Sequence, residues 1–380
     1  MKAKLTKAGL VASLAVGVLL TGCATDAPQD TWQPEGYYAR EIDNLQRPVF
    51  YVAGIVGVIV TAAVLYCVIK FRARAGEEVV PHQSHGNTKL EIGLTLLSTL
   101  TLVAIVPSSV GTLWRVTNKP DNAMNVTVIG QQWWWEYQYD GMNIVTANEL
   151  VIPEKTKIRL RITSRDVIHS FWIPKLNGKR DAVPNRYHTL NLESDGTGVY
   201  DGQCTEFCGL SHANMRQKAV VLSDADFKVW VANQQQNAAQ PPAATMAAKG
   251  EETFIAQCVR CHQVNGLQNA NGEPLQSQAD EQLVSGAAPN LTHLMSRTTF
   301  AGGTFNLKNE GCDATPPGTP TGTTLECLNR SQLEAWLRNA PEEKPMYAIL
   351  NDDKKYRGMP NLNLTEQQID ELVAYLATLK

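Results

Sequence analysis

Two long apolar stretches near the N-terminus restrict the fold of this chain more than any other feature. Residues 49–69 carry no charged side chain, and residues 90–114 carry only Glu91, near their start. Backbone N–H and C=O groups find no water inside a bilayer, so a spanning segment must satisfy them internally as a helix. About 20 residues suffice for one crossing. The sequence therefore predicts two transmembrane helices, at about 49–69 and 90–114.

The charges that flank these stretches predict their orientation. The connector carries Lys70, Arg72, Arg74 and Lys89, and basic residues favour the cytoplasmic side of a bilayer. Both the start of the chain and everything after Trp114 are then expected on the outer face.

The first 22 residues have the pattern of an export signal. Three lysines precede a short apolar run from Ala8 to Leu20. The run ends in Leu20-Thr-Gly-Cys23, which resembles the lipobox of bacterial lipoproteins. We therefore expect a signal peptide at 1–22 and a lipid on the Cys23 thiol, on the outer side that the connector predicts. An ordinary signal with an incidental cysteine is the alternative.

The remainder of the 380 residues changes its periodicity twice. Short alternating runs separated by Gly, Pro and Asn indicate an all-β sandwich or barrel at 120–230. A polar, Pro- and Ala-rich linker follows at 231–248. Residues 249–380 then show a helical pattern with two candidate capping boxes, Ser331-Gln-Leu-Glu334 and Thr365-Glu-Gln-Gln368. The formal net charge of −3 provides no basic field for nucleic acid.

Two thiols, an imidazole and a thioether lie within twelve residues of the β region. The stretch is Cys204-Thr-Glu206-Phe-Cys208-Gly-Leu-Ser-His212-Ala-Asn-Met215. Sulfur and imidazole ligands favour copper over magnesium or calcium. One more imidazole is needed, and His169 before Pro174 is the better candidate, with His188 the weaker one. A plain disulfide between Cys204 and Cys208 is the alternative reading.

The helical region carries a second redox motif. Cys258-Val-Arg-Cys261-His262 has the spacing for covalent attachment of a c-type haem. On one helical turn the two thiols and the imidazole share a face. Of the remaining cysteines, Cys67 lies within a predicted span. Cys312 and Cys327 flank a loop rich in Pro, Gly and Thr and are expected to form a disulfide.

Residues 48–222 resemble cytochrome c oxidase subunit II, and the whole chain resembles the caa-type subunit that has a fused cytochrome c domain. The resemblance is carried by His169-Ser-Phe-Trp, Asp181-Ala-Val-Pro, the Cys204–Cys208 motif and His212-Ala-Asn-Met215. It implies a multidomain fold: a lipid anchor segment and two-helix membrane hairpin at 23–119, an all-β Greek-key cupredoxin domain at 120–230, and an all-α class I cytochrome c domain at 249–380.

The resemblance also implies a ligand set for a binuclear copper centre, CuA. Cys204 and Cys208 would bridge two coppers, with His169, His212 and Met215 as terminal ligands. Glu206 would contribute its backbone carbonyl to copper and its side chain to a magnesium ion at the interface with subunit I.

Four further roles follow from the same resemblance. Trp133 matches the tryptophan through which electrons enter CuA, with strand packing as the alternative. Glu91 resembles a carboxylate at the mouth of a proton-uptake channel, or it simply sits among lipid headgroups. Met359 resembles the axial haem ligand opposite His262, with Met346 as its rival. Ala288-Pro289-Asn290 resembles the segment that supports the haem histidine.

The expected function is electron transfer into a proton-pumping cytochrome c oxidase of a bacterial cytoplasmic membrane. Electrons would pass from a cytochrome c donor to haem c, to CuA and on to subunit I, with subunit III as a further partner. Oxygen would be reduced in subunit I. The alternatives are the equivalent subunit of a CuA-containing nitric oxide reductase and a membrane-anchored copper-handling or assembly protein. The haem motif argues against the copper-handling alternative, because copper delivery does not require a covalent haem.

Overall fold

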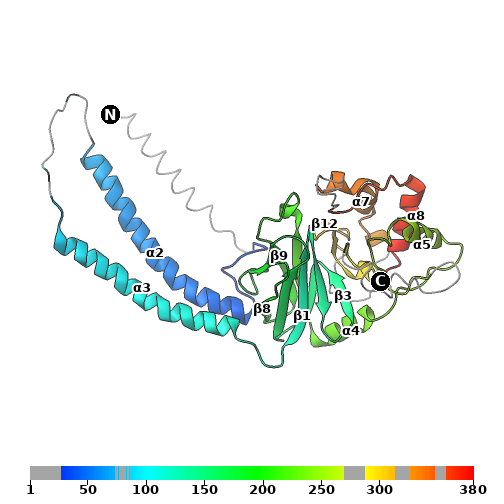
Figure 1. Cartoon of the computed structure of the whole chain (residues 1–380), viewed down its shortest axis with the longest axis horizontal. Coiled ribbons are helices and arrows are strands. Elements are labelled where there is room, and N and C mark those ends of the chain that lie inside the picture. The colour runs from blue at the N-terminus through cyan, green and yellow to red at the C-terminus, as the bar shows by residue number, and fades with distance from the viewer. Residues whose placement is uncertain are drawn as a thin grey trace.

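The computed structural model describes residues 27–72, 76, 83, 85–268, 287–312, 325–346 and 357–380. These residues form three parts, which Figure 1 shows side by side. A helical hairpin projects from one side of a β-sandwich domain, and a mainly helical C-terminal domain packs against the other side. The signal peptide and Cys23 lie outside the described residues.

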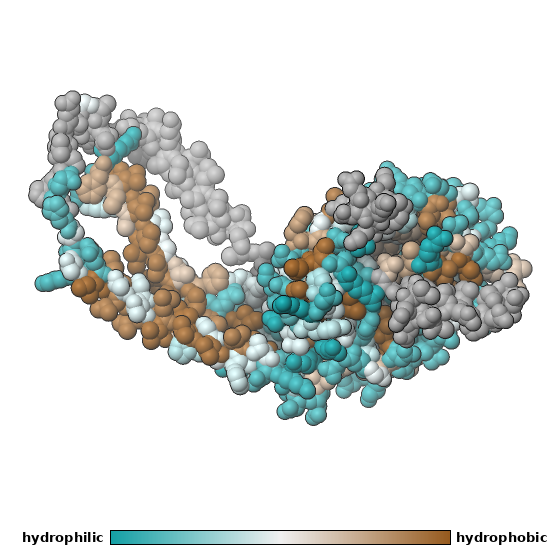
Figure 2. Space-filling model, in the orientation of Figure 1, coloured by the Kyte–Doolittle hydropathy of each residue, from teal (hydrophilic) through white to brown (hydrophobic). Residues whose placement is uncertain are grey.

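The hairpin consists of α2 (Tyr37–Lys70) and α3 (Thr88–Thr117), each longer than the predicted span within it. With a rise of about 1.5 Å per residue, the two helices measure about 50 and 45 Å. Both are long and apolar enough to cross a membrane, and their apolar windows are not covered by the rest of the chain. Figure 2 shows this apolar surface beside the largely hydrophilic domains.

The open ends of the hairpin adjoin the β-sandwich domain. Arg115 near the end of α3 pairs with Glu41 in α2, and Asn191 donates hydrogen bonds to the carbonyl oxygens of Val116 and Asn118. The end of α2 at Lys70 and the start of α3 at Thr88 therefore lie at the far end of the hairpin, away from both domains (Figure 1). This is the arrangement that the positively charged connector predicts for two membrane crossings.

Two five-stranded sheets make up the β-sandwich domain. Their orders are β3-β2-β1-β5-β8 and β4-β10-β9-β6-β7, in which β1 with β5 and β4 with β10 are parallel pairs. The strands are β1 (Met124–Gln131), β2 (Trp134–Tyr139), β3 (Ile144–Ala147), β4 (Glu149–Pro153), β5 (Ile158–Ser164), β6 (His169–Trp172), β7 (Arg180–Ala182), β8 (His188–Leu192), β9 (Gly198–Cys204) and β10 (Arg216–Leu222).

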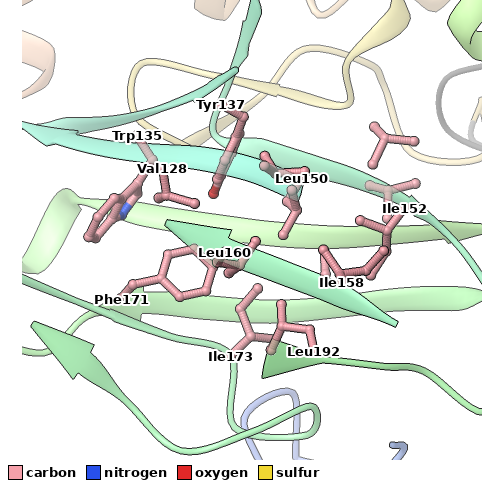
Figure 3. Packing of buried hydrophobic residues seen from close by; sticks show 14 of the residues in the cluster. Val128, Trp135, Tyr137, Leu150, Ile152, Ile158, Leu160, Phe171, Ile173 and Leu192 are labelled. Atoms are coloured by element: carbon pink, nitrogen blue, oxygen red, sulfur yellow. The ribbon is translucent and has the colours of Figure 1, made fainter. Parts of the chain in front are cut away.

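The inward residues of both sheets form one apolar core. Val128 and Leu160 from one sheet meet Leu150 and Phe171 from the other, all with no exposed surface (Figure 3). Strand residues alternate between two faces, so the alternation in the sequence places these side chains inside. After β10, α4 (Asp224–Gln234) packs Phe227 and Trp230 onto the same core. The non-helical stretch that follows, 235–245, lies within the predicted linker.

The C-terminal domain is built on a crossing of α5 (Met246–Gln257) with α8 (Glu366–Leu376). A Cβ on Gly250 would lie 1.9 Å from the Glu371 carbonyl oxygen, so only glycine permits this close approach. The remaining elements among the described residues of this domain are η2 (Leu294–Ser296), β11 (Thr299–Phe300), β12 (Phe305–Asn306), η3 (Leu325–Cys327) and α7 (Arg330–Glu343). A disulfide joins Cys312 to Cys327.

Candidate functional site

The structure gathers the predicted copper ligands at one end of the β-sandwich domain. Cys204 Sγ lies 3.8 Å from Cys208 Sγ, 3.9 Å from His169 Nδ1 and 3.3 Å from the Glu206 carbonyl oxygen. Cys208 Sγ lies 3.5 Å from His212 Nδ1 and 3.8 Å from Met215 Sδ. We call these six residues the sulfur cluster.

Strand pairing positions the sulfur cluster. Cys204 ends β9, where it pairs with Phe171 of β6, and β6 begins at His169. The loop returns through η1 (His212–Asn214), and the Cys204 N–H donates to the Met215 carbonyl at 2.9 Å. Backbone hydrogen bonds of one sheet therefore fix both ends of the loop 204–215 and also the position of His169. Such a scaffold allows little rearrangement around a redox metal.

The electrostatics of the two thiols favour a cation between them. The hydrogen bond between Cys208 and Cys204 lowers the pKa of the Cys204 thiol to about 4, and the same contact raises the pKa of the Cys208 thiol. Two thiolates this close repel each other. A pair of soft, buried sulfurs with imidazole and thioether neighbours matches the preferences of copper.

Asp166 contacts the edge of the His169 ring that faces away from Cys204. Its Oδ1 atom lies 2.8 Å from His169 Nε2, while Nδ1 faces the Cys204 sulfur. A carboxylate behind a metal-binding imidazole fixes the ring orientation and raises its basicity. His188, the weaker candidate, instead lies on β8 of the opposite sheet, with its Nδ1 atom 2.8 Å from the Asp181 carbonyl oxygen. The structure therefore brings His169 and not His188 into the sulfur cluster.

A cavity of about 310 Å³ gathers the residues of the haem motif, and we call it the haem cavity. Cys258 follows α5 directly, and the His262 N–H donates to the Cys258 carbonyl at 2.9 Å, so the motif occupies a single helical turn. The His262 ring is positioned by its Nδ1 atom, 2.8 Å from the Pro289 carbonyl oxygen. Its other nitrogen is thereby left for a metal.

Both candidate sulfur ligands, Met359 and Met346, line the haem cavity. The Met359 N–H donates to Met346 Sδ at 3.3 Å. Their packing differs, because Met359 lies against the core of the C-terminal domain whereas Met346 lies against the core of the β-sandwich domain. The packing favours Met359 as the partner of His262 across the cavity.

Trp133 connects the sulfur cluster with the haem cavity. Its indole Nε1 donates to the Cys208 carbonyl at 3.1 Å, and the same carbonyl accepts from Gln132 Nε2 at 2.6 Å. Trp133 also lines the haem cavity and is only 2% exposed. Its neighbour Trp135 packs edge-on against His169 and Phe171, within the core of the sandwich.

Sequence reasoning missed two buried basic residues that line the haem cavity. Burial lowers the pKa of Arg297 to about 10 and that of Lys344 to about 7. Arg297 Nε is buried without a hydrogen-bond partner in the part of the chain that the structure describes. A buried guanidinium with a free donor is suited to an anionic group. Neither residue belongs to a local motif, so spacing gave no signal for them.

Comparisons with known proteins agree with both sites. Residues 142–222 match the family described as the periplasmic domain of cytochrome c oxidase subunit II, and residues 247–341 match cytochrome c. The subunit 2 of Alkalihalophilus pseudofirmus is 30% identical over 372 residues, covering 96% of this chain and 94% of the relative. The chain belongs to the cytochrome c oxidase subunit 2 family. The predicted resemblance and the fold class are thereby confirmed.

A second relative and one solved structure are also similar to this chain. Subunit 2 of Bacillus sp. strain PS3 is 32% identical over 326 residues, which are 82% of this chain and 80% of that one. The crystal structure of the periplasmic domain of subunit II from Bradyrhizobium japonicum is 31% identical and covers 31% of this chain and 96% of its own, with a TM-score of 0.30. As a family member, the chain is a component of an oxidoreductase complex and has a role in electron transfer.

Two of the predicted acidic site residues lie at exposed positions. The side chain of Glu206 is exposed beside the sulfur cluster, next to Phe207, which is 77% exposed. Glu91 lies in the first turn of α3, at the connector end of the hairpin, and accepts from the Asn87 N–H at 3.2 Å. Their proposed roles in metal binding and proton uptake both involve groups outside this chain.

Proposed function

We propose that this chain accepts electrons from a cytochrome c donor and delivers them to the haem of oxidase subunit I. One observation carries the proposal: Trp133 contacts the sulfur cluster and also lines the haem cavity. Its indole donates to the Cys208 carbonyl, and the residue lines the cavity together with Cys258, His262 and Met359. A conjugated side chain between two redox sites gives a short path that excludes water.

The sulfur cluster is proposed to hold the binuclear CuA centre. Cys204 and Cys208 would bridge the metals, and His169, His212 and Met215 would be terminal ligands, together with the Glu206 carbonyl. The ligand atoms already lie within 4 Å of a cluster sulfur. Bound copper would supply a one-electron couple. The chain's own contribution is a rigid, buried ligand frame in which Asp166 orients His169.

The haem cavity is proposed to hold a covalent haem c. Cys258 and Cys261 would form the thioether bonds, and His262 and Met359 would be the axial ligands. The fit is supported by the Pro289 carbonyl behind His262 and by Arg297 Nε, which has no hydrogen-bond partner among the described residues and suits an anionic propionate. Haem c would supply the first electron acceptor. The apolar side chains that line the cavity would shield the haem from water, and Trp133 is one of the lining residues.

The remaining expectations concern the membrane and the complex. We propose that α2 and α3 both cross the bacterial cytoplasmic membrane, that Cys23 is lipidated, and that both domains lie on the outer face. Glu206 would share a magnesium ion with subunit I, and Glu91 would face the proton-uptake side. Subunits I and III are the proposed partners, and the complex would pump protons.

Purification of the complex from membranes tests this proposal. We expect copper, covalent haem c, haem a and cyanide-sensitive oxygen uptake with reduced cytochrome c. Nitric oxide consumption without oxygen uptake would overturn the oxidase assignment. A Cys208→Ser variant should lose the near-infrared CuA band while it keeps the haem c spectrum. If the band survives in that variant, the sulfur cluster is not the copper site.

A further inference from the structure

Buried ionisable side chains form hydrogen bonds across the surface between the two domains. Glu149 on β4 of the β-sandwich domain is 3% exposed. Its Oε1 atom accepts from the N–H of Thr298 at 2.9 Å, the N–H of Thr299 at 2.8 Å, and both threonine hydroxyls at 2.7 Å. A buried carboxylate is costly unless it is fully hydrogen-bonded. Here the donors all belong to the C-terminal domain.

Lys344 of the C-terminal domain makes the reciprocal contact. It is also 3% exposed, and its Nζ atom donates to the Trp133 carbonyl at 3.0 Å and to the Ala301 carbonyl at 2.9 Å. The first of these carbonyls belongs to the β-sandwich domain. One buried acidic and one buried basic side chain therefore form hydrogen bonds across the boundary.

The backbones of the two domains also approach closely. A Cβ on Gly302 would lie 2.4 Å from both Lys344 Nζ and the Trp133 carbonyl oxygen, and this glycine has a φ of +76°. The Arg216 N–H donates to the Gly302 carbonyl at 2.9 Å, and Thr304 Oγ1 donates to the Asn214 carbonyl at 2.8 Å. Contacts this close form only when the two domains have one defined relative position, unlike the contacts of two surfaces that meet transiently.

An ion pair and the linker also restrict the movement of the two domains relative to each other. Arg357, two residues before Met359, pairs with Asp166 of the β-sandwich domain at 3.9 Å. The linker lies along the C-terminal domain, because the Ala238 N–H donates to the Asn265 carbonyl at 2.9 Å and Gln240 Nε2 donates to the Gly266 carbonyl at 3.0 Å. A linker that is hydrogen-bonded to the C-terminal domain in this way allows little movement of that domain relative to the β-sandwich domain.

We propose that Glu149 and Lys344 are anchors that hold the C-terminal domain permanently over Trp133. Trp133 is then an internal relay that a soluble donor does not reach, and the donor delivers its electron to the C-terminal domain. The second part rests on the proposed function, whereas the permanent docking stands without it. Trp133 is only 2% exposed, lines the haem cavity and accepts through its backbone carbonyl from Lys344 of the docked domain.

Cleavage of the linker tests the docking in the intact complex. A protease site inserted between Pro242 and Ala243, both in the non-helical linker, allows the covalent connection to be cut. Permanent docking predicts that the haem-bearing domain stays with the membrane complex after cleavage and washing at physiological salt. Release of the domain upon cleavage would overturn the proposal.

Hydrogen exchange gives a readout that needs no electron transfer. The amides of Thr298, Thr299 and Arg216 donate across the boundary and should exchange as slowly as amides inside β10. Glu149→Gln combined with Lys344→Met should speed the exchange of the Thr298 and Thr299 amides at least about tenfold and release the cleaved domain. Unchanged exchange and retention in this double variant would show that these residues are not the anchors.

Two controls distinguish the loss of the anchors from a general effect of substitution and from unfolding of either domain. Lys249 is exposed on α5, and Lys249→Met should leave exchange and retention as in the wild type. Intact CuA and haem c spectra in the double variant show that both domains remain folded. A complex with slow exchange and full retention but no oxygen uptake would contradict the proposed function and leave the docking in place.

Discussion

Asp166 Oδ1 lies 2.8 Å from His169 Nε2, on the ring edge opposite the nitrogen that faces the Cys204 sulfur. The same carboxylate accepts from the backbone N–H of Gln132 at 2.8 Å, through its other oxygen. One buried side chain thus orients His169, a proposed copper ligand, and the segment that carries Trp133. Burial by itself raises the pKa of Asp166, but the hydrogen bonds with His169 and with the backbone N–H groups of Gln132 and Val167 together bring it below its usual value.

Removing the Asp166 carboxylate should weaken copper binding. In an Asp166→Ala variant the His169 ring loses its fixed orientation, and loss of such a supporting group typically costs about 10–100-fold in metal affinity. Copper retention against a chelator, followed by the near-infrared band, measures the effect. Asp166→Asn keeps an acceptor and should lose less, and Asp121→Ala, at an exposed position, should lose nothing. Equal copper retention in Asp166→Ala would argue against this role.

The two methionines of the haem cavity should respond differently to truncation. Met359→Ala should abolish the thioether–iron charge-transfer band and lower the haem c reduction potential, because a Met ligand raises it. Met346→Ala should keep the band, since Met346 packs against the core of the β-sandwich domain. The visible spectrum of the oxidised protein decides between them. The opposite pattern would make Met346 the ligand.

Much of the fold was predictable because the sequence patterns are local. Alternation in the strands predicted the sandwich, and two uncharged stretches predicted α2 and α3. The Thr365 capping box is present in the structure, where Thr365 and Gln368 cap each other. The Ser331 box was wrong: the N-cap of α7 lies two residues earlier, at Asn329, which accepts from the Gln332 N–H at 3.4 Å. Asn329 is also tied to the Asn306 carbonyl, a tertiary contact that no local pattern reveals.

The sulfur cluster was predictable because four of its side chains lie within twelve residues. His169 lies apart from them in the sequence, and its place before Pro174 at a strand end made it a better candidate than His188. The contacts between the domains were not predictable, since Glu149, Lys344 and Gly302 come from distant segments and have no motif. Their positions follow from how the C-terminal domain packs, which is a property of the tertiary structure alone.

Placing a methyl group at the helix crossing should destabilise the C-terminal domain. Glycine in a helix interior usually costs about 0.5–1 kcal/mol relative to alanine, so Gly→Ala at an open site is stabilising. In Gly250→Ala the new Cβ would lie 1.9 Å from the Glu371 carbonyl oxygen, which forces α5 and α8 apart. We expect a net loss of about 1–3 kcal/mol. Thermal loss of the haem c spectrum measures it.

Gly196→Ala is the matched control for this change. A Cβ there meets nothing within 4 Å, and the variant should unfold at the wild-type temperature. A Gly250→Ala protein with an unchanged or higher unfolding temperature would show that the two helices can separate without cost.

The buried carboxylate of Glu136 should make the stability of the β-sandwich domain depend on pH. Glu136 is 3% exposed, and burial raises its pKa even though Arg165 lies at 3.1 Å and Gln138 at 2.6 Å. Below the usual pKa of about 4.5 the group is protonated in both the folded and the unfolded state. As the pH rises above this value the unfolded state loses its proton first, so the stability falls until the pH passes the folded pKa.

Glu136→Gln should remove this dependence, because an amide is neutral at every pH. Relative to the wild type, the variant should gain stability as the pH rises above about 4.5, and the gain should level off once the wild-type group is ionised in the folded state. The temperature at which the near-infrared CuA band disappears, measured from pH 4 to 8, follows this difference. Glu310→Gln, at an exposed position, should give the wild-type profile. Parallel profiles for Glu136→Gln and the wild type would rule out Glu136 as the source, since only a group that titrates differently in the two states changes the slope.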